Sequence, residues 1–239
     1  MVTNSHKNSR PGCDASILLK REGSARGASS SKSLRGFEVI DDIKAEVEKA
    51  CPYTVSCTNI ITTAARDATL KIGDPFWHVP FGRKDGLVSV AKEAEMVPMG
   101  HENVTSLIKF FQSRGLSLLD LVILSGTVHS LHKLEVIMLT KISPSFSIWA
   151  SEYVDVDGTT PKTFDSTYYT NLQKKMGLLS TDQLLYSDSR TAPIVTALAT
   201  QPWLFYRQFA VSMVNLGKTQ ILTGSDEGEI RTNCNFVNH

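Results

Sequence analysis

The sequence predicts a mainly α protein that folds as one domain over residues 1–239. Apolar residues recur at helical spacing in several segments, and Pro or Gly stands where most of these segments end. No internal repeat and no linker divides the chain. A content of 41% apolar residues is enough to bury one large core or two small ones.

Two helices are predicted in the first third of the chain, after a solvated loop over residues 20–34. The first spans 35–50, and Cys51-Pro52 ends it because proline cannot continue the backbone hydrogen bonds. The second begins at Ser56, a favourable N-cap residue, and reaches Leu70. In the first helix an apolar face is expected opposite a charged one; the former comprises Phe37, Ile40, Ile43 and Val47, the latter Asp41, Lys44 and Glu48.

The rest of the chain also reads as helices separated by turns. Residues 77–86 are rich in turn formers and allow at most a short strand. Helices are predicted over 102–113, 118–134, 164–176, 193–199 and 203–216, with Gly217 directly after the last one. Residues 133–148 show no clean period.

Composition narrows the functional class only slightly. The net charge of +1 suggests no nucleic-acid partner, and no run of eighteen apolar residues predicts a membrane span. The first seven residues contain no apolar core typical of a secretory signal. The sequon Asn103-Val104-Thr105 would accept a glycan if the chain enters the secretory route.

The four cysteines leave two interpretations open. The spacing of Cys13, Cys51, Cys57 and Cys234 does not match a zinc site. The even number is compatible with disulfides, and free thiols are equally compatible with composition alone.

One segment carries a family resemblance. Gly12-Cys13-Asp14-Ala15-Ser16-Ile17-Leu18-Leu19 resembles the loop that follows the distal helix of secretory (class III) plant haem peroxidases. Further blocks resemble the same family in the same order: residues 33–41, 51–57, 64–67, 79–85, 120–126, 160–165, 177–183 and 228–234. The resemblance covers about residues 10–131 and 149–238, leaving 1–11 unmatched and 132–148 unlike the family. It implies a haem-peroxidase-like helical fold with very little β structure, in which the distal helices are incomplete.

On the proximal side of the haem, the resemblance implies His129 as the axial iron ligand and Asp182 as the acceptor of its second ring N–H. Such an acceptor raises the basicity of the imidazole and fixes its orientation. The family reads Ser-Gly-X-His, whereas this chain has one extra residue, Val128, before the histidine. One residue rotates a helix by roughly 100°. A helix that starts one residue later, or a π-bulge, would turn His129 back toward the haem. His132 is the alternative ligand.

On the distal side, peroxide cleavage needs a base and a cation. The position of the family's distal histidine aligns with His6, but the position of the family's distal arginine aligns with Val2. Lys7, Asn8 and Ser9 replace the family's Asp-Cys-Phe, and Ser30 lies near the register of an asparagine that tunes the distal histidine. We therefore expect little or no peroxidase turnover even if haem binds.

The resemblance also implies two calcium ions, a cation that prefers oxygen ligands. The ligand positions of the proximal ion align with Ser130, Asp157, Thr160, Thr163 and Asp165. For the distal ion Gly12, Asp14 and Ser16 match, but Lys7 and Ser24 replace carboxylates, so this site is expected to be degraded. Asp157 and Asp165 are equally explained as turn and N-cap residues.

The remaining expectations also come from the family. Cys57 and Cys234 match a disulfide with both partners present, whereas Cys13 and Cys51 match half-cystines without theirs. Pro98 aligns with a residue that contacts aromatic donors at the haem edge. The family location is secreted or cell-wall, and we expect a monomer.

The expected function is haem-dependent oxidation of phenolic donors by hydrogen peroxide, in responses to oxidative stress or in the cell wall. We expect this activity to be weak or absent in the chain. The alternative is a non-catalytic, peroxidase-like scaffold that binds a small ligand or a wall component.

Overall fold

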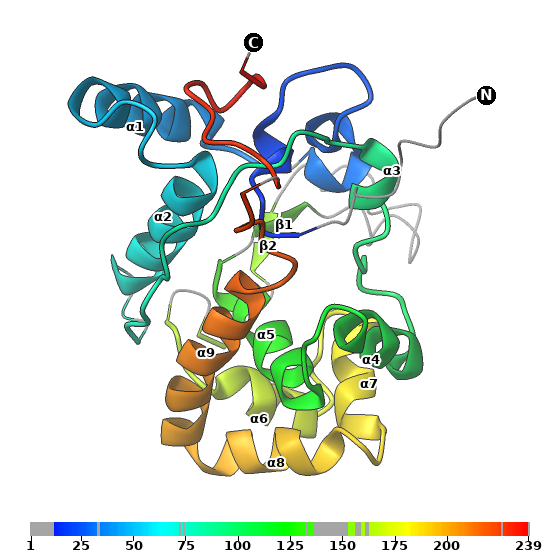
Figure 1. Cartoon of the computed structure of the whole chain (residues 1–239). Coiled ribbons are helices and arrows are strands. Elements are labelled where there is room, and N and C mark those ends of the chain that lie inside the picture. Colours follow the sequence, from blue (N-terminus) through cyan, green and yellow to red (C-terminus); the bar gives the residue numbers. More distant parts are fainter. Residues whose placement is uncertain are drawn as a thin grey trace. The chain divides into compact units, whose positions relative to one another are not determined.

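The computed structural model describes residues 12–32, 34–71, 73, 75–131, 133–135, 153–155, 159–160, 163–225 and 227–238 (Figure 1). The chain forms two compact units. The first unit comprises Met1–Leu70, Phe76–Met99 and Met213–His239, and the second comprises Lys71–Pro75 and Gly100–Ser212. Each unit is therefore assembled from segments that are distant in the sequence.

The first unit is built from short turns of helix and two longer helices. Three 3-10 turns come first, η1 (Ser16–Leu18), η2 (Ala25–Gly27) and η3 (Ser29–Ser31). They are followed by α1 (Phe37–Ala50), α2 (Cys57–Lys71) and the single turn α3 (Ala91–Ala94), which packs against η2. The core between these elements consists of buried Ala15, Leu18, Ile40, Cys57, Ile60 and Cys234.

The α1 helix differs from the prediction in which side chains it buries. Lys44 was assigned to the charged face, but only 2% of it is exposed. Its ammonium donates to Glu48 Oε1 and to the carbonyl of Val55, both at 2.6 Å, so its charge is satisfied inside the unit. Ile43 was assigned to the apolar face and is 38% exposed. The buried face of α1 is therefore not the face that the apolar spacing predicts.

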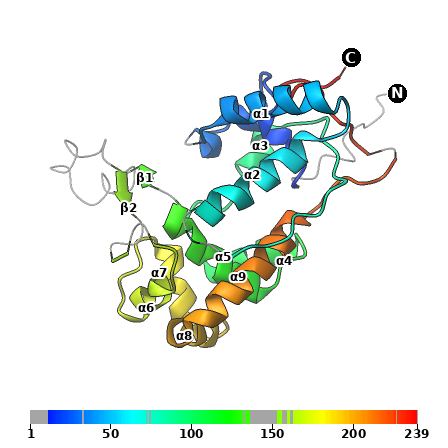
Figure 2. The same cartoon turned by 90° about the vertical axis from the view of Figure 1, so that its left-hand side faces the viewer.

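The second unit is a helical cluster. It contains α4 (Val104–Gln112), α5 (Leu118–Leu131), α6 (Thr167–Gln173), α7 (Ser180–Ser187), α8 (Ala192–Thr200) and most of α9 (Pro202–Gly217). The α8 helix packs against α5, α6 and α7, and α4 packs against α5 and α7 (Figure 2). The short strands β1 (Lys133–Glu135) and β2 (Tyr153–Asp155) pair antiparallel, with Leu134 opposite Val154.

Aromatic side chains fill the core of the second unit. Phe164 stacks on Phe205 with ring centroids 4.8 Å apart and tilts against Phe209 at the same distance. Tyr169 meets Phe205 edge to face. Consecutive residues Leu121–Ile123 of α5 are all at most 1% exposed, so α5 is buried on every side at this turn.

The prediction of a mainly α fold with very little β structure is confirmed, and several boundaries are corrected. The predicted helix 118–134 ends at Leu131, and a strand begins at Lys133. Gly217 is the last residue of α9 and does not follow it. The α3 and α7 helices were not predicted, because one or two turns carry too few apolar positions to define a period.

No helix in the described part of the chain combines the length and the apolar character needed to cross a membrane.

Candidate functional site

The α5 and α6 helices approach each other closely at Gly126. A Cβ atom added there would lie 2.5 Å from the hydroxyl of Tyr169 and 3.0 Å from Cδ1 of Tyr168. A side chain larger than hydrogen would therefore force the helices apart. Tyr169 donates to the carbonyl of Val122 at 3.2 Å, which fixes the ring against α5.

This contact sets the rotation of α5 where the predicted iron ligand lies. The helix is α-helical up to Leu131, without a π-bulge. His129 follows Gly126 by three residues, which is roughly 300° around an α-helix. The backbone therefore brings the Cα atom of His129 close to the side of α5 that faces α6. The side chains of residues 127–131, and all of His132, lie outside the described residues, so the choice of axial ligand stays a prediction.

Asp182 is buried at the start of α7 and is only 3% exposed. Its Oδ2 accepts the backbone N–H of Leu179 at 3.1 Å, and its Oδ1 accepts the hydroxyl of Tyr168 at 3.0 Å. A carboxylate in the first turn is also favoured by the helix dipole. The hydrogen bonds from Leu179 and Tyr168 thus hold the Asp182 carboxylate in place without any contribution from a histidine.

Tyr168 is the residue of this site that the sequence prediction missed. Burial, together with the charge of Asp182, raises the pKa of its phenol well above the ordinary value. The phenol therefore stays protonated at neutral pH and acts as a donor to the carboxylate. The sequence offers only a tyrosine pair at 168–169, and it is the packing of α6 on α7 that directs one of them to Asp182.

The residues predicted for the proximal calcium ion are described in part. Thr160, Thr163 and Asp165 lie in the loop before α6, where Thr163 N–H donates to the carbonyl of Thr160 at 3.1 Å. Asp165 Oδ1 accepts the N–H of Thr167 at 2.7 Å, an Asx turn that precedes α6, whose N-cap residue is Ser166. The side chain of Ser130 and all of Asp157 lie outside the described residues.

The residues predicted for the distal calcium ion form one turn of the first unit. Asp14 is 8% exposed, and its Oδ1 accepts the N–H of Ser16 at 3.0 Å. A Cβ atom on Gly86 would collide with the Asp14 carboxylate, so glycine is required there. Burial raises the pKa of Asp14 above its ordinary value, against smaller opposing effects from Ser16 and Arg231. Of the other predicted positions, Ser24 is buried in η2's N-terminal turn and Lys7 lies outside the described residues.

Within the described ranges, no three His, Cys, Asp or Glu side chains come close enough together to hold a metal ion. A calcium ion in either loop would therefore depend on hydroxyl and carbonyl oxygens as much as on carboxylates, a ligand set that calcium accepts.

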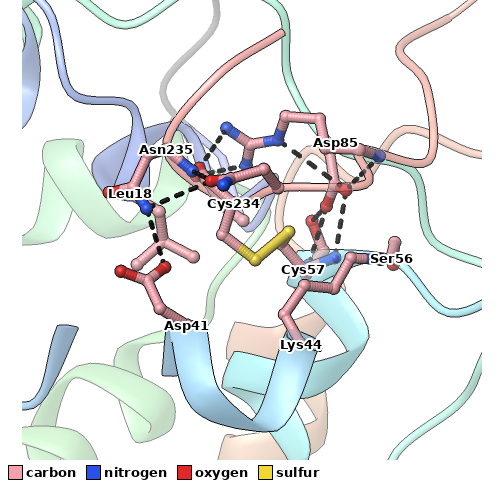
Figure 3. Close-up of a disulfide and its surroundings, with 12 residues drawn as sticks. Leu18, Asp41, Lys44, Ser56, Cys57, Asp85, Cys234 and Asn235 are labelled. Carbon is pink, nitrogen blue, oxygen red and sulfur yellow. Dashed lines mark hydrogen bonds and ion pairs between the residues drawn. A yellow bond between two sulfur atoms is a disulfide. The ribbon is translucent and has the colours of Figure 1, made fainter. Parts of the chain in front are cut away.

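The predicted disulfide between Cys57 and Cys234 is confirmed, with Cα atoms 5.7 Å apart (Figure 3). Cys13 and Cys51 are free in the structure. The Cys13 thiol donates to the carbonyl of Leu216 at 3.3 Å, and burial raises its pKa. Cys51 is exposed.

A buried carboxylate lies beside this disulfide (Figure 3). Asp85 is fully buried and accepts the backbone N–H groups of Cys57 and Thr58, at 3.0 and 2.8 Å, and that of Arg231 at 3.0 Å. It therefore caps α2 in addition to Ser56, whose hydroxyl accepts the N–H of Asn59 as predicted. The capping role of Asp85 could not be read from the sequence, since 28 residues separate it from Cys57.

Pro98, Ser30 and His6 are the other predicted positions. Pro98 is half-buried in a segment whose side chains Met96, Val97 and Met99 are each about half exposed. Ser30 donates its hydroxyl to the carbonyl of Ala94 at 3.0 Å, which ties η3 to α3. His6 lies outside the described residues.

The chain is similar to known plant proteins over most of its length. A family model described as peroxidase matches residues 4–201. Peroxidase 7 of Arabidopsis thaliana is 48% identical over 250 residues, which cover 95% of this chain and 71% of that protein. A basic peroxidase of Zinnia elegans is 37% identical, covering 93% and 75%, and peroxidase N of Armoracia rusticana is 37% identical, covering 95% and 77%. The chain therefore belongs to the peroxidase family and, within it, to the class III peroxidases of plants.

Proposed function

We propose that this chain binds haem b through His129 of α5, with Asp182 as the acceptor of the second ring N–H of that histidine, and that it oxidises phenolic donors with hydrogen peroxide only slowly. The observation that carries the haem proposal is the buried carboxylate of Asp182, which accepts hydrogen bonds from Tyr168 and from the N–H of Leu179. A carboxylate can accept hydrogen bonds from several donors, and an imidazole N–H is a suitable one. These residues fit the proximal side of a haem.

When bound, the haem supplies the redox chemistry, and the protein's contribution is ligation, orientation and proton transfer. His129 would hold the iron through one ring nitrogen. Asp182 would accept a hydrogen bond from the N–H of the other ring nitrogen. Tyr168 would hold Asp182 through its hydroxyl. Asp182 keeps this place because Leu179 and Tyr168 bind both of its oxygens.

The slow rate is proposed from the residues at the distal catalytic positions. Val2 cannot supply the positive charge that stabilises a departing oxyanion. His6 would be the base, but the residues after it differ from those that surround it in the family. Loss of general acid–base catalysis alone costs roughly 10²–10⁴ in rate.

The phenolic donor is proposed to lie at Pro98. The neighbouring apolar side chains of Met96, Val97 and Met99 are about half exposed, so they can receive the face of an aromatic ring. By family, the protein is expected to act as a secreted or cell-wall monomer.

Of the two calcium sites, we propose that the proximal one is the stronger. Its ligands would be Thr160, Thr163 and Asp165 with Ser130 and Asp157, which supply two carboxylates. The distal loop offers a single carboxylate, Asp14, whose raised pKa opposes the charged form that calcium needs.

Reconstitution of the purified chain with haemin tests the haem proposal. We expect a Soret band that shifts on binding and that is lost in His129→Ala but kept in His132→Ala. Asp182→Asn should keep the band and raise the reduction potential of the iron, because a neutral acceptor lowers the basicity of the imidazole. No Soret shift in the unmodified chain would overturn haem binding, and loss of the band in His132→Ala alone would move the ligand to that residue.

Guaiacol oxidation by the reconstituted protein tests the rate. We expect turnover about 10² times or more below that of a relative with a complete distal pair, assayed in parallel. Turnover equal to that of the relative would contradict the proposed impairment.

A further inference from the structure

A shallow hollow of about 370 Å³ lies in the second unit, between α4, the start of α5 and the turn that joins α7 to α8 (Figure 1). The described residues that line it are Thr105, Ile108, Lys109 and Gln112 of α4, Leu118 of α5 and Arg190 of the turn. Sites for small molecules begin at about 300 Å³, so the hollow is large enough for one. It shares no residue with the positions proposed for haem, calcium or the phenolic donor.

One face of α4 supplies most of the lining. Thr105, Ile108, Lys109 and Gln112 stand at positions i, i+3, i+4 and i+7, which are neighbours on one side of an α-helix. Ile108 and Leu118 are partly buried and give the hollow an apolar part, whereas Lys109 and Gln112 are exposed. A ligand can therefore meet apolar and polar groups together.

Arg190 reaches the hollow with a guanidinium that the fold has already oriented. Its Nε and Nη2 donate to the two carboxylate oxygens of Asp188, at 2.9 and 2.7 Å, and Nη2 also donates to the hydroxyl of Thr105 at 2.9 Å. The hydrogen bonds from Arg190 lower the pKa of Asp188 to about 2, so this pair is charged at neutral pH. Nη1 has no acceptor among the described residues, so part of a fixed, planar donor group remains for a ligand.

Lys109 gives the hollow a positive charge that no carboxylate offsets. Its Nζ has no acceptor in the described part of the chain, whereas Asp188 balances the charge of Arg190. The described lining itself contains no acidic residue. One unbalanced positive charge, a second group of N–H donors and an apolar part are together complementary to an anion that carries an apolar body.

We propose that this hollow binds a small carboxylate with an apolar ring. The carboxylate would accept hydrogen bonds from Lys109 Nζ and Arg190 Nη1, and the ring would contact Ile108 and Leu118. Gln112 would be free to bind a polar substituent of the ring. The site goes beyond the proposed function, because it needs neither haem nor peroxide.

Titration with sodium benzoate, followed in the amide nitrogen–proton NMR spectrum, tests the proposal. The sample is the full chain with the disulfide between Cys57 and Cys234 formed and without haemin, so a failure to bind haem cannot affect the outcome. We expect the amide signals of Lys109, Leu118 and Arg190 to shift along one saturable curve. Benzamide, which has the same ring but no charge, should shift them much less, and so should acetate, which has the charge but no ring.

A substitution at Lys109 tests the role of its charge. Lys109→Gln should raise the Kd for benzoate about two- to fivefold, the effect of losing one exposed charge pair. Lys174→Gln is the matched control, since it removes an exposed lysine of the same unit outside the hollow, and it should leave Kd unchanged.

Three results would overturn the proposal. The first is the absence of a saturable shift in the unmodified chain, and the second is an equal loss of affinity in the two lysine variants. The third is equally tight binding of benzoate and benzamide, which would show that the hollow recognises the ring without the carboxylate.

Discussion

Asp14 is a carboxylate at a predicted calcium position, but its surroundings disfavour its ionised form. The carboxylate is buried against Gly86, and its nearest hydrogen-bond donor is a backbone N–H. Burial favours the protonated form, and this effect outweighs the opposing effects of Ser16 and Arg231. Its pKa is therefore raised above the ordinary value.

The pH dependence of stability should reveal Asp14. A raised pKa in the folded state means that its contribution is present at acidic pH and is lost as the pH rises through the folded value. In a calcium-free buffer, Asp14→Asn should therefore be more stable than the unmodified chain at neutral pH, and the difference should shrink on acidification. Denaturant unfolding at several pH values measures it, and a difference that grows on acidification would contradict the assignment.

The two free thiols should differ in reactivity. Thiolate is the reactive form, and burial raises the pKa of Cys13, whereas Cys51 is exposed. Iodoacetamide should modify Cys51 of the native chain well before Cys13, as followed by peptide mass spectrometry. In Cys51→Ser the native chain should remain unmodified until it is unfolded, and equal rates at both sites would show that the Cys13 region is open.

At the scale of elements, carboxylates at the starts of two helices link these helices to other parts of the chain. Asp85 caps α2 across 28 residues, and Asp182 caps α7 while it binds Tyr168 of α6. Such caps link one element to another, so the helices depend on the tertiary fold. Short helices like α7 are marginal in isolation.

Removal of the Asp85 carboxylate should be strongly destabilising. Arg231 is fully buried beside it, with its Nε 3.7 Å from Oδ2, and would be left without its partner. Asp85→Ala should lower the free energy of unfolding by about 3–5 kcal/mol. Asp67→Ala, which removes an exposed carboxylate of α2 paired with Arg66, should change it by less than about 1 kcal/mol. Equal losses in the two variants, measured by urea unfolding, would refute the role of Asp85.

At the scale of the whole molecule, the chain builds each compact unit from distant segments. The first unit joins the region around Cys57 to the C-terminal region around Cys234 by a disulfide across 177 residues. Closing so long a loop reduces the entropy of the unfolded chain considerably.

Loss of this disulfide should therefore destabilise the protein by about 2–5 kcal/mol. The double variant Cys57→Ser, Cys234→Ser should unfold at a clearly lower urea concentration, as measured by circular dichroism. Cys51→Ser serves as the control and should unfold like the unmodified chain. An unchanged midpoint in the double variant would show that the hydrogen bonds of the C-terminal segment, among them those of Arg231 and Asn235, hold it without the disulfide.

The sequence by itself determined the helical class and the N-cap at Ser56, because periodicity and capping residues are local properties of the chain. Its ordered motifs carried the family resemblance, and only that resemblance supplied the disulfide partners. The sequence did not determine the burial of Lys44, the α7 helix, the donor to Asp182 or the cap at Asp85. Each of these depends on residues brought together from separate segments, where packing and the satisfaction of buried polar groups outweigh local preference. The tertiary structure alone decided them, since only there do Tyr168, Asp182 and Gly126 become neighbours.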